Sequence, residues 1–378
     1  METNNLDNIL LNEPEVEYED LSSGVLMEKP FNPTKIDITT KPLTIDLLIK
    51  RLKADPIEID LAPAFQRKSD LWDEQKQSQL IESLLIKFPL PAFYFDGSDN
   101  NKWLVVDGLQ RLSSLRNFVI LKKLRLKGLE FLNKLEGHSF DELPRNLQRQ
   151  IEEAQITAYI INPGTPEEVK FNIFKRINTG GLILNSQEIR HALNQGVSAT
   201  FIAELADLKD FKEATEYAIN PNRMMDREFV TRFIAFYLYP YTDYVPDLDT
   251  YMNRAMSDIK KLPIQQRDKI KTDFAKSMKL AKMIFDNWAF RKSDKYPDKR
   301  KPINKALFEV WSVLLAKLDE SNREKLERKK DILFEKSVSL TKEDTTFFSS
   351  ITTSTGNKSC VIDRFTKIEN IIKETLLQ

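Results

Sequence analysis

Apolar and polar residues follow strand and helix periods in turn along the first half of the chain. Alternating or continuously apolar runs predict strands at residues 57–61, 92–95, 102–106 and 155–161. Apolar residues three and four apart predict helices at residues 42–53, 73–87, 112–120, 139–153, 166–178 and 186–194. The turn sequence DGSDNN separates the second and third strands, so we expect these two to form a hairpin or to be near neighbours.

Strand patterns end at about residue 200. Beyond it, helical spacing predicts helices at residues 226–239, 250–262, 267–290, 303–318 and 360–377. The pattern therefore predicts an α+β fold in three parts. These are an acidic mobile arm over residues 1–35, a domain of mixed sheet and helices over 36–200, and an all-α domain over 201–378.

Charge is divided unevenly along the chain. The 378 residues carry no net charge, but residues 1–30 contain eight acidic residues and one basic residue, so this segment has a net charge of −7 and the rest +7. Such a segment is either a solvated tail or a cover for a basic cleft, where its carboxylates compete with phosphates.

Composition excludes several classes of site. With one cysteine, Cys360, the chain has no intrachain disulfide and no cysteine zinc cluster, which fits a reducing compartment. With two histidines, His138 and His191, it cannot contain an HNH nuclease centre of the usual form. Residues 1–30 lack a signal-peptide pattern, and no apolar run reaches the roughly 18 residues of a membrane span. We therefore expect a cytoplasmic protein without a membrane partner.

The stretch VVDGLQRLSSL, residues 105–115, places polar residues where a strand gives way to a helix. A helix N-terminus presents unpaired N–H groups and partial positive charge, which favour an anion. Asp107 could bind Mg²⁺ or orient a water, and Gly108 would let a ligand approach the backbone. Gln110 and Arg111 could bind phosphate or ribose oxygens. An Asp-Gly turn with an arginine salt bridge explains the same residues equally well.

Two further stretches carry candidate ligand contacts. Gln66 and Arg67 follow the first predicted strand and could face the same ligand; the alternative is a surface arginine. Asn178, Thr179 and Gly180 lie between two predicted helices and could clamp a phosphate, although from the residues alone a helix C-cap is the better explanation.

The predicted helical domain contains a basic stretch with aromatic residues. It is WAFRKSDKYPDKRKPINK, residues 288–305, and its candidate DNA-binding residues are Lys292, Lys299, Arg300 and Lys301. Basic and aromatic side chains together suit a nucleic-acid backbone. A solvated loop between helices is the alternative.

Five stretches occur in an order that resembles a known family. They are FQR followed by W, LIESLLIKFPLP, VVDGLQRLSSL, FKRINTGGLILNSQEIRHAL and RMMDREFVTRFIAF. Over residues 42–240 the chain resembles the domain of unknown function 262 family, which has a DGQQR hallmark and belongs to the ParB/sulfiredoxin-like superfamily. This domain is the N-terminal half of GmrSD-type modification-dependent restriction enzymes and of related phage-defence proteins.

The resemblance implies a ParB/sulfiredoxin-like fold for the first domain and a nucleotide pocket around the hallmark. Asp107 and Arg111 would be catalytic, and Asp107 would also hold Mg²⁺; Leu109 stands where the family usually has Gln. The implied nucleotide-binding residues are Gln66, Arg67, Gly108, Gln110, Asn178, Thr179 and Gly180. The ligand would be an NTP of unspecified base, and nuclease activity would come from a partner subunit or from the ParB-like fold itself.

Three hypotheses of function follow. The first is a nucleotide-binding, NTP-hydrolysing protein of a phage-defence or restriction-like system, in which the state of the NTP is coupled to DNA binding. The second is a non-catalytic DNA-binding or adaptor module that uses the same pocket as a ligand switch. The third and weakest is a metal-dependent DNA nuclease. A homo-oligomer is compatible with all three.

Overall fold

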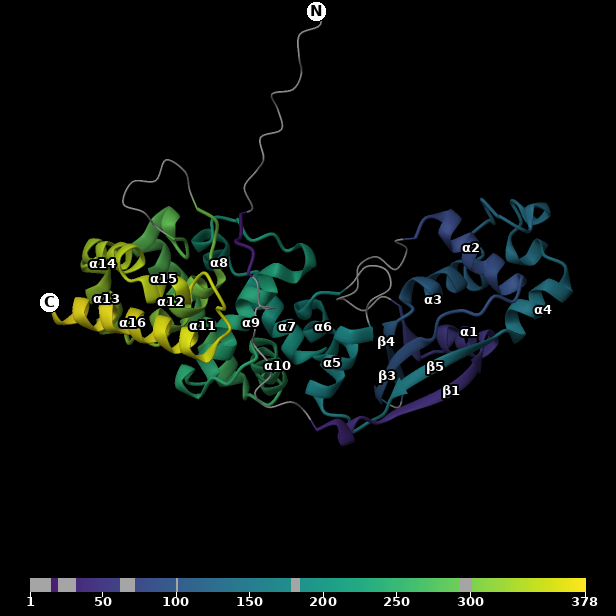
Figure 1. The fold of residues 1–378 in the computed structure, drawn as a ribbon, viewed down its shortest axis with the longest axis horizontal. Helices are drawn as coiled ribbons and strands as arrows, with labels where there is room; N and C mark the ends of the chain where they lie inside the picture. Colours follow the sequence, from purple (N-terminus) through teal and green to yellow (C-terminus); the bar gives the residue numbers. More distant parts are fainter. Residues whose placement is uncertain (1–14, 20–31, 62–71, 100, 178–183, 293–300) are drawn as a thin grey trace, which may run out of the picture. The chain divides into compact units, whose positions relative to one another are not determined.

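The computed structural model describes residues 15–19, 32–61, 72–99, 101–177, 184–292 and 301–378 (Figure 1). The chain divides into two compact units. One, which we call the sheet unit, is Phe31–Leu193; the other, the helical unit, combines Met1–Pro30 with Asn194–Gln378. The fold class is α+β as predicted, with strands in the N-terminal part and helices after it.

The sheet unit is built on a five-stranded mixed sheet with the order β1-β5-β3-β4-β2. The strands are β1 (Ile38–Thr44), β2 (Ile59–Asp60), β3 (Phe93–Asp99), β4 (Lys102–Asp107) and β5 (Gln155–Ile161). β3 pairs antiparallel with β4, which confirms the predicted neighbours, and β1 pairs antiparallel with β5. The pairs β3–β5 and β2–β4 are parallel.

Four of the helices of this unit pack on one face of the sheet, because alternate strand residues such as Phe93, Phe95 and Val105 are apolar and buried against them. The helices are α1 (Ile45–Lys53), α2 (Glu74–Leu85), α3 (Leu109–Leu115), α4 (Arg145–Glu153), α5 (Glu167–Ile177) and α6 (Ser186–Leu193). Phe93, Phe95 and Val105 belong to one buried cluster with side chains of α1 to α4. α5 contacts β4 and α6.

The prediction of a helix over residues 42–53 is wrong at its start. Residues Ile38–Thr44 form strand β1, and the helix begins only at Ile45. The Thr44 hydroxyl accepts a hydrogen bond from the Leu47 N–H at 3.3 Å, so the last strand residue is also the N-cap of α1.

The helical unit contains no strand among its described residues beyond isolated bridges. Its helices are α7 (Val197–Ala206), α8 (Lys209–Ala214), α9 (Met225–Leu238), α10 (Leu248–Ile259), α11 (Ile264–Phe285), α12 (Lys305–Ala316), α13 (Glu320–Arg328), α14 (Lys330–Glu343), α15 (Thr345–Ser350) and α16 (Lys358–Leu377). They share a large buried apolar cluster that includes Phe229, Phe274 and Phe308. The pattern did not predict α7, α8, α13, α14 or α15.

Part of the acidic arm packs on the helical unit. Val16 forms a parallel bridge with Ile303, and Val16 contacts the apolar cluster of that unit. Of the predicted mobile arm, residues 15–19 therefore have a defined place, while residues 1–14 and 20–31 lie outside the described residues.

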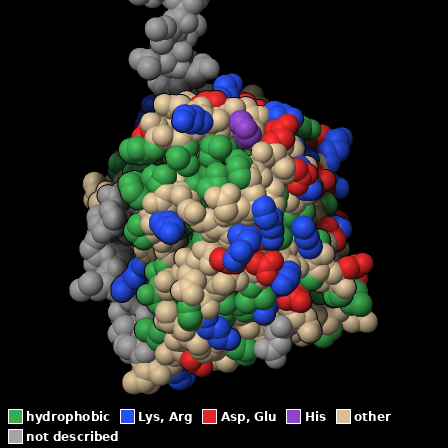
Figure 2. Space-filling model, turned by 90° about the vertical axis from the view of Figure 1, so that its right-hand side faces the viewer, with side chains coloured by type: hydrophobic (Ala, Val, Ile, Leu, Met, Phe, Trp, Pro, Cys, Tyr) green, Lys and Arg blue, Asp and Glu red, His purple; other side chains and the backbone are tan. Residues whose placement is uncertain are grey.

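The face in Figure 2 lies at the α2–α4 end of the sheet unit and carries charged side chains of both signs among hydrophobic ones. Phe88 and Phe131 of this unit are exposed and contact each other edge to face, with 6.3 Å between ring centres. None of the described helices combines the length and apolar character that a membrane span needs.

Candidate functional site

The candidate site lies where β4 ends and α3 begins. Asp107 is the last residue of β4, and Gly108 is the N-cap of α3 with φ +102°. A Cβ at position 108 would lie 2.5 Å from Cδ1 of Phe93, so both the backbone angle and the available space require glycine. This turn brings Asp107 and Arg111 to the same side of the junction.

Arg111 is held by several groups of the protein. Its Nη2 lies 2.7 Å from Oδ2 of Asp107 and donates to the Ala92 carbonyl at 3.1 Å. Nη1 donates to the Pro91 carbonyl, and the guanidinium lies 4.3 Å from the centre of the Phe93 ring. Arg111 therefore ties the start of α3 to the residues that precede β3, and only 10% of its side chain is exposed.

Burial sets the electrostatics of this pair. It raises the pKa of Asp107, and the Arg111 charge opposes that shift. Burial likewise lowers the pKa of Arg111, and Asp107 opposes it. Tyr94 lies opposite Asp107 in the β3–β4 register, and burial raises its pKa. The Asp107 side chain is 21% exposed although it is paired with Arg111.

Gln110 connects the junction to α2. Its Oε1 accepts a hydrogen bond from the Trp72 N–H at 3.2 Å, and the Trp72 carbonyl accepts one from Gln77 Nε2 at 2.7 Å. Asn117 Nδ2 donates to Gln77 Oε1 at 2.9 Å, so a buried chain of amides fixes the backbone at residue 72.

The hydrogen-bonded amides end at Trp72, and Gln66 and Arg67 belong to the segment before it. Both residues lie outside the described residues, between the end of β2 and Trp72. β2 and β4 are parallel neighbours, so their carboxyl ends meet at the same edge of the sheet. The segment that carries Gln66 and Arg67 thus starts at the sheet edge that holds Asp107 and ends at the residue bonded to Gln110.

The structure adds residues that the sequence did not predict. The Tyr94 and Tyr159 rings stack with centres 4.9 Å apart, on neighbouring strands β3 and β5. Lys170 of α5 is buried, and its Nζ donates to Ser98 Oγ at 2.6 Å and lies 3.7 Å from Oδ2 of Asp96. The lysine interrupts the apolar face of the predicted helix 166–178, and this was the only sequence signal of its position.

The remaining predicted contacts are only partly described. Asn178, Thr179 and Gly180 lie outside the described residues, as do Lys299 and Arg300 of the DNA-binding prediction. Lys292 and Lys301 belong to the helical unit, and Lys292 Nζ lies 3.0 Å from Oε1 of Glu17. Leu109 is partly buried against the apolar cluster of the sheet unit, where the family's usual Gln would place a polar group.

Asp107 would bind a metal ion only together with a bound nucleotide. In the described part of the chain, no three His, Cys, Asp or Glu side chains form a group that could hold a metal ion. Mg²⁺ commonly uses one or two carboxylates together with the phosphates of a bound nucleotide, so a single partly exposed carboxylate fits that mode.

The part of the chain that contains this junction is similar to a known domain family. Residues 48–194 match the GmrSD restriction endonuclease N-terminal domain. No curated protein and no solved structure matches the chain. The GmrSD match begins within α1 and ends next to α6, so it contains the Asp107 junction and nearly coincides with the sheet unit. The similarity to a GmrSD N-terminal domain, predicted over residues 42–240, is thus supported for residues 48–194. The domain of unknown function 262 family, the DGQQR hallmark and the ParB-like superfamily stay predictions.

Proposed function

We propose that this protein belongs to a restriction-like or phage-defence system and binds a nucleoside triphosphate at the Asp107 junction. The observation that carries the proposal is a partly exposed carboxylate in a strand-to-helix turn that requires glycine, within the segment similar to a restriction endonuclease domain. Asp107 would hold Mg²⁺ together with the phosphates. Gln66, Arg67, Asn178, Thr179 and Gly180 would contact the nucleotide from the two neighbouring segments.

Within this proposal, Arg111 has a specific task. Its guanidinium already binds Asp107 and two carbonyl groups, so it fixes the carboxylate and stabilises its charge. Direct contact with a phosphate would require Arg111 to leave these partners. Hydrolysis would change how the helical unit holds DNA through Lys292, Lys299, Arg300 and Lys301.

The engagement of Arg111 also favours a second candidate. If Arg111 keeps its protein partners, its guanidinium is not available to stabilise the charge that develops during phosphoryl transfer. The protein would then bind nucleotide without turnover and act as a DNA-binding or adaptor module.

The test compares Asp107→Asn with Asp141→Asn, an exposed aspartate of the same unit that pairs with Lys122 at 2.6 Å. We measure binding of ATP, GTP, CTP and UTP with Mg²⁺, and phosphate release with and without DNA. Asp107→Asn should weaken nucleotide binding at least about tenfold, equal to roughly 1.4 kcal/mol. Asp141→Asn should bind like the wild type.

The outcomes separate the candidates. Phosphate release that Asp107→Asn abolishes supports an NTPase, and binding without release supports the switch module. A folded Asp107→Asn protein that binds every nucleotide as the wild type does rules out this site.

A further inference from the structure

The acidic segment at residues 15–19 is held on the helical unit by its backbone. The Glu17 N–H donates to the Ile303 carbonyl at 2.9 Å, and the Ile303 N–H donates to the Glu15 carbonyl at 2.9 Å. This pairing places two carboxylates of the segment, those of Glu17 and Glu19, against basic side chains of the unit.

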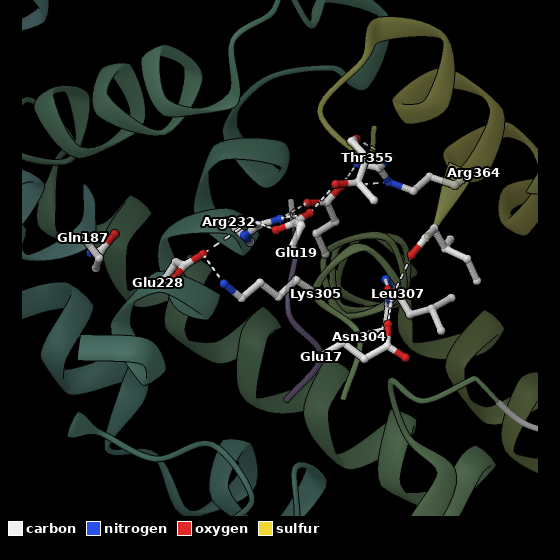
Figure 3. Close-up of polar contacts among 12 residues, drawn as sticks. Glu17, Glu19, Gln187, Glu228, Arg232, Asn304, Lys305, Leu307, Thr355 and Arg364 are labelled. Carbon is white, nitrogen blue, oxygen red and sulfur yellow. Dashed lines mark hydrogen bonds and ion pairs between the residues drawn. The ribbon is translucent and has the colours of Figure 1, made fainter. Parts of the chain in front are cut away.

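Glu19 is an anchor in a balanced buried cluster (Figure 3). It pairs with Arg232, whose side chain is 1% exposed, and accepts a hydrogen bond from the Thr355 hydroxyl. The cluster has three cations and three carboxylates, contributed by Arg232, Lys305, Arg364, Glu19, Glu228 and Glu309. Removal of Glu19 would leave a buried positive charge unbalanced, so this residue holds the segment in place.

Glu17 occupies a different environment. Its Oε1 lies 3.0 Å from Lys292 Nζ, and its Oε2 accepts a hydrogen bond from Asn304 Nδ2 at 2.7 Å. Glu17 lines a cavity of 580 Å³ whose other charged residues are Lys292, Lys301 and Lys342. Lys301 and Lys342 form no ion pair with any residue that the structure describes, so the cavity keeps an excess of positive charge with Glu17 in it.

An aromatic side chain completes this cavity. Phe348 lines it and is 45% exposed, and Lys292 Nζ lies 5.6 Å from the centre of its ring. Lysines beside an exposed ring are the elements that bind a nucleic-acid strand, because the cations bind phosphates and the ring stacks on a base.

We propose that this cavity binds a single nucleic-acid strand through Lys292, Lys301, Lys342 and Phe348, and that Glu17 covers it by taking the place of a phosphate on Lys292. The inference rests on the DNA-binding part of the proposed function. An incoming strand displaces Glu17 from Lys292, while Glu19 keeps the segment attached to the unit. The Glu17 carboxylate then competes with the strand for Lys292, and a strand displaces it only when it makes enough other phosphate contacts.

The experiment measures binding of a fluorescent single-stranded oligodeoxynucleotide to the full chain, without added nucleotide. Glu17→Gln keeps the acceptor for Asn304 and removes the charge. Its matched control is Glu327→Gln, an exposed acid of α13 outside the cavity. We expect Glu17→Gln to bind about fivefold more tightly at low salt, as expected for the loss of one competing ion pair. This gain should shrink as the salt concentration rises, because salt screens the Glu17–Lys292 ion pair that competes with the strand in the wild type.

A second pair of variants tests the cavity itself. In the Glu17→Gln background, Lys342→Ala should remove the gain, whereas Lys330→Ala, at an exposed position on α14 outside the cavity, should not. Equal gains for Glu17→Gln and Glu327→Gln would mean that only the net charge of the protein matters, and would overturn the proposal. Lower stability without tighter binding would make Glu17 a structural contact only, and would overturn it as well.

These results are independent of the nucleotide experiment. If the wild type binds an NTP and Glu17→Gln gains no affinity for DNA, the proposal that Glu17 covers a strand site is wrong and the nucleotide site stands. If no nucleotide binds but Glu17→Gln gains affinity, the nucleotide site fails and the covered strand site stands.

Discussion

At the scale of single residues, the Asp107 junction depends on a glycine that no other residue replaces. Gly108 has a left-handed backbone, and the ring of Phe93 fills the space where a side chain would start. The same ring packs under the Arg111 guanidinium, so a shift of Phe93 would also disturb the partners of Asp107. The shape of the candidate site and the stability of the unit are therefore linked at this position.

Gly108→Ala should lower the free energy of unfolding of the sheet unit by about 2 kcal/mol or more, since a strained φ and a clash act together. The matched control is Gly137→Ala, which has φ +76° but no atom within 4 Å of the added Cβ. Gly137→Ala should lower the free energy of unfolding by only about 1 kcal/mol, because it adds backbone strain without a clash. Urea unfolding measures both, and equal losses would contradict the packing argument.

At the scale of elements, the sequence predicted what local periodicity determines. Strands β4 and β5 and helices such as α2, α5 and α16 lie close to their predicted ranges, because their apolar faces are regular. Strand β3 was predicted only to residue 95 but continues to Asp99, into the predicted turn. Strand β1 was missed because Leu43 fits the helical spacing of Leu47 and Leu48, while its pairing with β5 is a long-range contact. The short helices α8 and α15 have too few turns for a visible period.

At the Asp107 junction too, only the contact between residues close in sequence could be predicted. The contact between Asp107 and Arg111 follows from a spacing of four residues in one turn, and the salt-bridge interpretation contained it. The carbonyls of Pro91 and Ala92 and the Tyr94–Tyr159 stack did not follow from the sequence. Their positions depend on which strands are neighbours in the sheet, and no local pattern carries that order.

An acid-sensitive link joins α15 to α16. Asp344 caps α15 by accepting from the Phe347 N–H at 2.8 Å, and its carboxylate lies 2.8 Å from Lys367 Nζ of α16. The hydrogen bond from Lys367, together with the capping N–H, lowers the pKa of Asp344 to about 2. A lowered carboxyl pKa stabilises the folded state above the unfolded pKa, and this contribution disappears as the pH falls through the folded value.

Asp344→Asn keeps a capping side chain and removes the charge, so it should lose about 0.5–1 kcal/mol at pH 7. The difference from the wild type should vanish as the pH falls from about 4 to 2, measured by urea unfolding at each pH. Asp319→Asn, at the cap of α13, has no lysine in an ion pair among the described residues and should change little. A difference that stays constant with pH would exclude the Lys367 link.

At the scale of the whole molecule, the chain has two apolar cores that share no residue among those described. The buried cluster around Glu309 lies in the helical unit, where Glu309 binds both Arg232 and Arg364. Each unit therefore has its own source of stability, and we expect each to unfold by its own transition.

Glu309→Gln should destabilise the helical unit by about 3–5 kcal/mol, because it leaves two buried arginines without their shared carboxylate. Hydrogen exchange of the full chain, followed peptide by peptide, should show faster exchange in residues 194–378 and unchanged exchange in residues 32–193. Glu327→Gln should leave both regions unchanged. Equal loss of protection in the two units would contradict their independence.

The contact between Glu19 and Thr355 spans 336 positions of sequence. During translation, residues 15–19 leave the ribosome long before the part of the chain on which they pack, whereas the sheet unit is complete much earlier. The helical unit can close only when Thr355 and Arg364 have been made. A ribosome that stops before that point therefore releases a chain with a finished sheet unit, an unanchored acidic segment and lysines that nothing yet covers.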